Sequence, residues 1–243
     1  MIQRISYCKV KKMEELTPFN KLKKSFFEVM ECHVVGNSWI KNFLFHLLLG
    51  SIFTKSGIKI GINKKISPRI SIFIIQSSGT GKGEAFDAFG EIVKRYNKKA
   101  EEVGLPAINI LERVTEFTSA GLIGSIEIIN RRPEVLEGLL KTHDILLFPE
   151  GKSFFSKKEY IKDIRHKLTS ALDEPGIVTK RLRLGLIAYE SKISIAVSTY
   201  PFTEIDVSLT EEGFLQRFLI SYKSFSEREK DEIDKKKICL KQF

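Results

Sequence analysis

The residues best suited to chemistry lie in one glycine-rich stretch, 77–83, which reads Ser-Ser-Gly-Thr-Gly-Lys-Gly. Glycines let backbone N–H groups curl around an anion, and the lysine adds a full positive charge. The apolar run 70–75 before this stretch is rich in β-branched residues and indicates a buried strand. After it, apolar residues recur at helical spacing, so a positive helix N-terminus would point at the same anion. Strand, glycine turn and helix together predict a phosphate-binding loop.

This loop departs at two positions from the pattern G-x-x-x-x-G-K-[ST]. Gln76 stands at the first glycine, and Gly83 replaces the Ser or Thr whose hydroxyl usually ligates Mg²⁺. Gly-Lys-Gly also occurs in nucleoside-monophosphate kinases, although a Thr usually follows there and Glu84 follows here. We predict that the loop binds ATP with Mg²⁺; the alternative is a glycine turn that binds nothing. The predicted cofactor-binding residues are Ser78, Gly79, Thr80, Gly81, Lys82, Gly83 and Glu84.

A second nucleotide-site signature is the apolar run 145–148, which ends in Pro149 and Glu150. In a Walker B strand an Asp holds Mg²⁺, and the Glu after it polarises the attacking water. Glu150 fits the second role, whereas Pro149 occupies the place of the Asp and cannot ligate a metal. Together with Gly83, this leaves the protein ligands of the metal unknown. The alternative interpretation is a buried strand with an acid at its exit.

The patterns around these two stretches predict the elements that must position them. Apolar residues at helical spacing predict two helices, over 18–32 and from Asn37 or Ser38 to about 53, as a small layer in front of the loop strand. Further helices are predicted from the loop to about 103 and over 118–129, 136–140, 158–173, 208–216 and the tail from 226. Further strands are predicted over 58–62, 107–111, 193–197 and 218–222, with a hairpin formed by 177–183 and 186–190.

The composition favours an anionic partner. The chain of 243 residues has a formal net charge of +10, which suits nucleic acid, although a lysine-rich surface without specific binding would give the same total. Three scattered cysteines and four histidines predict neither a disulfide framework nor a zinc site. The most apolar stretch, 43–53, is too short to span a bilayer, and Met1 does not begin a signal peptide. We therefore expect a cytoplasmic protein without membrane contacts.

In motif order, residues 40–222 resemble the AAA+ and related P-loop ATPases of DNA replication. The resemblance is closest to the helicase-type ATPase domains of phage, plasmid and viral primase–helicase proteins, which adds a virus- or plasmid-bearing host as one option for the source. It implies a polar sensor residue at the end of the strand after Glu150, where Ser198 and Thr199 stand. It also implies that the arginine of Leu215-Gln216-Arg217-Phe218 reaches the γ-phosphate of a neighbouring subunit.

A more distant likeness is to minichromosome-maintenance helicases. That likeness implies a basic hairpin that faces DNA in the pore of a ring, and residues 177–190 would supply it through Lys180, Arg181 and Arg183. The tail after the last predicted strand, 223–243, would be too short for the helical lid of a standard AAA+ domain. This departure, with Gly83 and Pro149, leads us to expect better nucleotide binding than hydrolysis.

The resemblance and the patterns together predict an α/β fold of the P-loop NTPase type, with a mainly parallel five-stranded sheet flanked by helices. We expect an N-terminal extension and helical layer over 1–56, an ATPase core over 57–225 and a charged tail over 226–243. The first functional hypothesis is a helicase-like ATPase that acts on single-stranded or forked DNA as a homo-oligomeric ring. Its catalytic residues would be Glu150, Arg217, Ser198 and Thr199.

Two alternatives remain at this point. The first is a degenerate P-loop module that uses ATP as a structural ligand and binds DNA or another partner. The missing Mg²⁺ ligands favour it. The second is a small-molecule kinase, which only the Gly-Lys-Gly sequence suggests. An ATPase measurement with and without single-stranded DNA separates all three.

Overall fold

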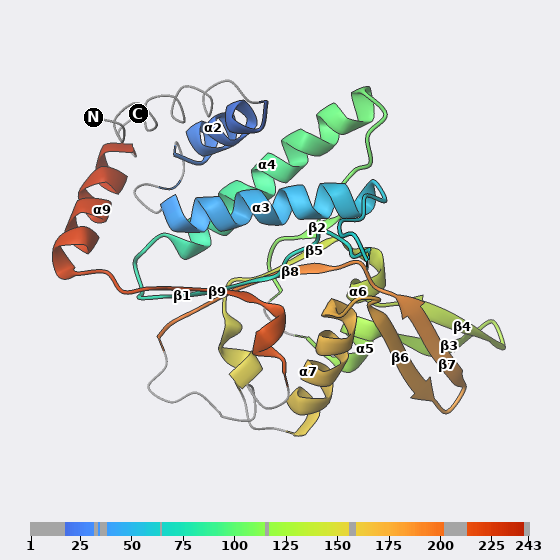
Figure 1. Ribbon diagram of the computed structural model, residues 1–243. Helices are drawn as coiled ribbons and strands as arrows, with labels where there is room; N and C mark the ends of the chain where they lie inside the picture. Colours follow the sequence, from blue (N-terminus) through green and yellow to red (C-terminus); the bar gives the residue numbers. More distant parts are fainter. Residues whose placement is uncertain are drawn as a thin grey trace.

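A computed structural model describes residues 18–31, 34, 38–63, 65–114, 117–155, 159–201 and 213–240. Its centre is a five-stranded sheet in the order β2-β5-β8-β1-β9, in which every neighbouring pair is parallel (Figure 1). The predicted α/β fold with a parallel five-stranded sheet is confirmed. The strands are β1 (Ile72–Gln76), β2 (Ile110–Leu111), β5 (Ile145–Phe148), β8 (Ser194–Thr199) and β9 (Leu219–Lys223).

Helices cover both faces of this sheet, which explains why its inner strands are almost entirely apolar (Figure 1). All residues of β5 and β8 are buried. Alternate side chains enter opposite cores, so Leu147 packs toward one layer of helices and Leu146 toward the other. One layer contains α2 (Pro18–Glu31), α3 (Ser38–Lys55) and α4 (Lys82–Glu102). The other contains α5 (Ser119–Ile123), α6 (Leu139–Thr142), α7 (Glu159–Leu172) and the short 3₁₀ helix η1 (Gly151–Phe155).

The two predicted N-terminal helices are present and share a core with the sheet. Phe26 and Met30 of α2 and Leu44 of α3 belong to the same buried cluster as Ile74 of β1. The close approach of α3 depends on Gly50, because a Cβ there would lie 2.6 Å from the Pro68 carbonyl oxygen. The helical layer therefore supports the strand that leads into the loop.

The predicted helix over 118–129 is wrong beyond its first turn. Thr118 caps α5 by accepting a hydrogen bond from the Gly121 N–H, but α5 ends at Ile123. Residues 124–137 instead form an antiparallel hairpin of β3 (Gly124–Ile129) and β4 (Arg132–Glu137). Asn130 and Arg131 have φ angles of 52° and 65°, which gives the two-residue turn that matches the twist of a hairpin. The helix predicted over 136–140 is correspondingly replaced by β4 and α6.

The second predicted hairpin is confirmed as β6 (Ile177–Leu182) and β7 (Gly185–Glu190). It lies beside the first hairpin, and the two project together at one end of the molecule (Figure 1). The side chain of Lys180 donates to the Gly124 carbonyl at 3.0 Å, and the Tyr189 hydroxyl donates to the Ile123 carbonyl at 3.1 Å. These bonds join the bases of the two hairpins.

The remaining differences concern short elements. The strand predicted over 58–62 is a single bridge between Ile60 and Ile66, and the strand predicted over 107–111 is reduced to β2. The helix predicted over 208–216 lies mostly outside the described residues, while 215–217 form a 3₁₀ turn, η2. The tail is helical as predicted, in α9 (Glu227–Leu240). In the parts of the chain that the structure describes, no helix is long and apolar enough to cross a membrane.

Candidate functional site

The glycine-rich loop connects the carboxyl end of β1 to the first turn of α4. Gly79 and Gly81 have φ angles of 78° and 80°, a left-handed conformation that glycine adopts without a steric penalty. Gly81 is the N-cap of α4 and brings no side chain to the helix end. The N-terminus of this long helix therefore offers its backbone dipole to an anion held by the loop.

Lys82 is the best-defined charged group of the loop. Its ammonium donates hydrogen bonds of 2.8 Å to the Gln76 carbonyl and 2.7 Å to the Ser77 carbonyl. The residue is only 8% exposed, and this burial lowers the pKa of Lys82 to about 8. The Nζ atom also lies 4.8 Å from the centre of the Tyr200 ring. Lys82 is thus held at the base of the loop, where desolvation destabilises its protonated form.

Gln76, the first of the two departures from the phosphate-loop pattern, supports the loop from its sheet side. It is fully buried at the end of β1, and its side-chain oxygen accepts a 3.3 Å hydrogen bond from Thr80. The Thr80 hydroxyl also lies 2.9 Å from the Ser77 carbonyl oxygen. The turn therefore keeps its curvature without a glycine at position 76.

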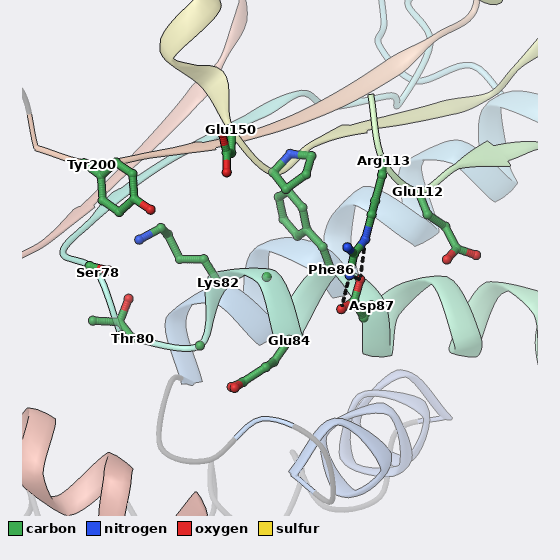
Figure 2. A pocket seen from close by; sticks show the side chains of 14 residues that line it. Ser78, Thr80, Lys82, Glu84, Phe86, Asp87, Glu112, Arg113, Glu150 and Tyr200 are labelled. Carbon is green, nitrogen blue, oxygen red and sulfur yellow. Dashed lines mark hydrogen bonds and ion pairs between the residues drawn. The ribbon is translucent and has the colours of Figure 1, made fainter. Parts of the chain in front are cut away.

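Pro149 and Glu150 form the wall opposite the loop. A Cβ at Gly151 would lie 2.3 Å from the Val197 side chain, so this glycine lets the turn after β5 pack closely on β8. The Ser198 hydroxyl donates to the Pro149 carbonyl at 2.6 Å and ties the same turn to β8. Figure 2 shows Glu150 pointing into the space beside Lys82 and Tyr200. Two contacts from β8 thus position the predicted catalytic acid.

Loop and wall enclose one cavity of about 400 Å³ (Figure 2). It brings together all the predicted cofactor-binding residues and Glu150, although Glu84 points away from Lys82 in Figure 2. Sequence reasoning missed five further side chains of this cavity. These are Phe86, Asp87, Glu112, Arg113 and Tyr200.

Three of the missed residues are charged and lie beside the first turns of α4. Arg113 donates to both oxygens of Asp87, at 2.8 and 2.7 Å. Glu112 forms a 2.9 Å ion pair with Lys94. Glu112 and Arg113 directly follow β2, and polar residues after a parallel strand belong at the edge where ligands bind. That position in the sequence was a usable signal for both.

The predicted sensor residues Ser198 and Thr199 lie outside the cavity lining. Ser198 is fully buried and Thr199 is 3% exposed, because both belong to the covered strand β8. The Ser198 hydroxyl is engaged by Pro149, as described above. The first residue of this segment that reaches the cavity is Tyr200, which is 50% exposed.

Arg217 lies at the other edge of the sheet. It precedes β9 and lines a second cavity of about 200 Å³ with the residues that lead into β1, β8 and β9. Its Nε donates to the Asp173 carboxylate at 2.9 Å, and a terminal nitrogen donates to the Gly213 carbonyl at 2.9 Å. Because all five strands are parallel, the amino edge that carries Arg217 is opposite the edge that carries the loop.

The three predicted DNA-binding residues are divided between the two faces of their hairpin. Lys180 is half-buried against the neighbouring hairpin, and desolvation lowers its pKa. Arg181 and Arg183 are exposed. Alternation along a strand explains the division, since Lys180 shares the inward face with the buried Val178. Only the two arginines are presented to solvent.

The residues present fit a nucleotide better than they fit a protein-bound metal. Among the described residues, no group of three or more His, Cys, Asp or Glu could hold a metal ion. Pro149 lines the cavity without a side-chain ligand atom, and the Asp144 carboxylate is paired with Lys55 at the amino end of β5. A Mg²⁺ ion would therefore be held mainly by the phosphates and water.

If the loop binds ATP as the sequence predicts, the pKa of Lys82 determines how the affinity depends on pH. Replacing Lys82 with Ala should abolish ATP binding without unfolding the chain. In the wild type, the ammonium loses its proton above about pH 8 and must regain it to hold a phosphate. Affinity should thus fall only about twofold from pH 7 to 8 and more steeply above that, approaching about tenfold per pH unit.

Calorimetric titration with ATP near pH 8, in two buffers of different ionisation enthalpy, should show proton uptake on binding. Lys82→Arg is the matched control, because a guanidinium stays charged throughout this range. Any affinity that this variant retains should be independent of pH. A wild-type affinity that stays constant up to about pH 10 would contradict the role of Lys82.

A hydroxyl at position 83 should strengthen the metal site. A Cβ at Gly83 would meet no described atom within 4 Å, so serine fits without displacing its surroundings. Gly83→Ser should raise Mg²⁺-dependent ATP hydrolysis by roughly an order of magnitude, the scale on which groups around a metal act. Gly83→Ala occupies the same space without the hydroxyl and should match the wild type. Equal rates for the serine and alanine variants would refute the missing-ligand interpretation.

Comparisons with known proteins identify no family for this chain, so a functional proposal has to rest on the geometry of the site. The elements that hold it form an α/β fold with a parallel sheet, and its side chains converge at the carboxyl edge of that sheet. No protein-family model matches the chain, and no curated protein shows significant similarity to it.

Proposed function

We propose that this chain is an ATP-binding ATPase of the replication-helicase type, which assembles into a ring on DNA and hydrolyses ATP weakly. One observation carries the proposal. The Lys82 ammonium, from the first turn of α4, and the Glu150 carboxylate, from the turn after β5, face one cavity at the carboxyl edge of a parallel sheet. In open α/β sheets this edge is where ligands bind.

In this proposal, different groups of the cavity bind the phosphates and activate the attacking water. The loop and the N-terminus of α4 bind the phosphates, and Lys82 places a charge against the outer ones. Glu150, across the cavity, orients a water molecule and accepts its proton. Mg²⁺ bound to the nucleotide would neutralise phosphate charge. Because Gly83 and Pro149 provide no side-chain ligand atoms, we expect turnover to be slow.

The position of β8 supports the AAA+ resemblance. This strand lies between β1, which carries the loop, and β5, which carries Glu150. Residues that leave its carboxyl end therefore emerge between the phosphate loop and the catalytic acid. A residue that senses the terminal phosphate, which the resemblance requires after this strand, would have to emerge there.

The position of Arg217 supports assembly, because the glycine-rich loop of the same chain lies at the opposite edge of the sheet. A guanidinium at that place can reach a phosphate only on another subunit, as in a head-to-tail ring. In the single chain Arg217 is held by Asp173 and the Gly213 carbonyl. Assembly would exchange these contacts for the phosphate of the neighbour.

The second candidate is a module that binds ATP without hydrolysing it. The lack of ligand atoms at Gly83 and Pro149 favours this alternative, as does the engagement of Ser198 by a backbone carbonyl. The two functions differ in turnover and not in affinity. A steady-state ATPase assay with and without single-stranded DNA, on material separated by size-exclusion chromatography, therefore distinguishes them.

Mixing two inactive variants tests the ring. Arg217→Ala should bind ATP like the wild type and lose hydrolysis, whereas Lys82→Ala should lose ATP binding. Mixed rings contain some interfaces that pair an intact loop with an intact arginine, so the mixture should recover part of the activity. Asp173→Asn is a useful companion variant, because it weakens the tether of Arg217 and leaves the arginine in place.

Two outcomes would remove the trans-arginine role. One is a mixture that stays inactive while labelled subunits demonstrably exchange. The other is a chain that remains a monomer at all concentrations with ATP and DNA present, which would favour the binding module.

DNA binding should depend on the exposed face of the second hairpin. Neutralising Arg181 and Arg183 together should weaken binding equally across sequences. It should also reduce the slope of log K against log salt by up to about 1.8 on duplex DNA, or about 0.9 per lost phosphate contact. Neutralising Lys180 alone is the control and should change the slope little, because that side chain is half-buried. An unchanged slope in the double variant would place the DNA-binding surface elsewhere.

A further inference from the structure

We propose that Tyr200 is the residue through which this site distinguishes a nucleoside triphosphate from a diphosphate. Its hydroxyl would donate a hydrogen bond to the terminal phosphate. The inference rests on the proposed nucleotide binding and assigns the sensing role to a residue other than Ser198 or Thr199.

The register of the sheet places Tyr200 beside the start of the loop. Thr199 is paired with Ile75, so Tyr200, the first residue after β8, lies at the level of Gln76, the last residue of β1. Gln76 provides one of the two carbonyls that hold Lys82. Tyr200 therefore emerges within reach of the Lys82 ammonium, and the two side chains are in contact.

The contacts of Lys82 explain why an aromatic hydroxyl is useful at this point. Two of the three N–H bonds of its ammonium go to the carbonyls of Gln76 and Ser77. At most one N–H bond then remains for a phosphate. The ring of Tyr200 lies 4.8 Å from Nζ, close enough for a cation–π contact that stabilises the charge before a ligand arrives.

The hydroxyl of Tyr200 is directed toward the end of Lys82, on the side where Glu150 enters the cavity (Figure 2). A phosphate that approaches both Lys82 and Glu150 must therefore enter the space beside this hydroxyl. Tyr200 is 50% exposed, so its ring can adjust without disturbing the core. A diphosphate held by the loop amides would end before this space, whereas a third phosphate would extend into it.

Ser198 and Thr199, which precede Tyr200, do not reach the cavity. Ser198 is fully buried and donates to Pro149, and Thr199 is 3% exposed within β8. Both residues lie outside the cavity lining, which Tyr200 joins. Each can influence the site by holding the strand, but only Tyr200 presents a hydrogen-bond donor to the cavity from this segment.

The test compares affinities for ADP and for a non-hydrolysable ATP analogue by calorimetry, at about pH 7 where Lys82 is charged. Tyr200→Phe keeps the ring over Lys82 and removes only the hydroxyl. It should weaken binding of the triphosphate by roughly tenfold, the usual scale for a hydrogen bond to a charged group, and change ADP binding less than twofold. Tyr200→Leu also removes the ring and should weaken both nucleotides.

Tyr222→Phe is the matched control, because this tyrosine is 65% exposed on β9 and lies outside the cavity lining. It should leave both affinities unchanged. Thr199→Val tests the competing sensor and should leave the ratio of the two affinities unchanged.

The outcomes separate the two proposals. A wild-type chain that binds neither nucleotide overturns the proposed function and this inference with it. Wild-type binding with an unaltered ratio in Tyr200→Phe overturns the role of Tyr200 alone. A ratio that changes in Thr199→Val and not in Tyr200→Phe returns the sensing role to Thr199.

Discussion

The hydrogen bonds from Lys82 to the carbonyls of Gln76 and Ser77 are the interactions on which the candidate site depends. They close the loop onto the end of the central strand β1, while Thr80 and the Gln76 side chain support it from below. Burial lowers the pKa of Lys82 to about 8 because desolvation disfavours the charged form. A nearby anion would favour the charged form and raise this pKa again. A loop built this way supports the proposal that it binds phosphate.

The parallel sheet then divides the polar groups of the molecule between two edges. Its covered faces admit few charges, so functional side chains can leave only at the ends of strands. Lys82, Glu150 and Tyr200 gather at the carboxyl edge, whereas Arg217 and Asp144 lie at the amino edge. This division means that a catalytic role for Arg217 requires a second subunit. It also restricts any hydrolytic role of Asp144, which pairs with Lys55 at the far edge.

Much of the fold could be predicted because its signals are local. The inner strands are apolar runs, the long helices have apolar faces, and the glycine turn lies between a strand and a helix. The hairpin over 124–137 was missed because Leu122, Ile123, Ile126 and Ile129 also fit helical spacing, and Asn130 with Arg131 is not a common turn pair. The position of Arg113 after β2 was a local signal, but its pairing with Asp87, 26 residues earlier in the chain, had none.

The sequence by itself determined the loop and the acid after β5, since each depends on neighbours within a few residues. The alternation of strand and helix patterns along the chain indicated the parallel α/β architecture. Only the tertiary structure decided which polar residue after β8 enters the cavity. Ser198, Thr199 and Tyr200 are consecutive and all carry hydroxyls, but the strand buries the first two and ends before the third. The same holds for Lys180 and Arg181, which strand alternation directs to opposite faces. Such choices depend on where a strand ends and on what covers it, and neither is encoded in the residue types alone.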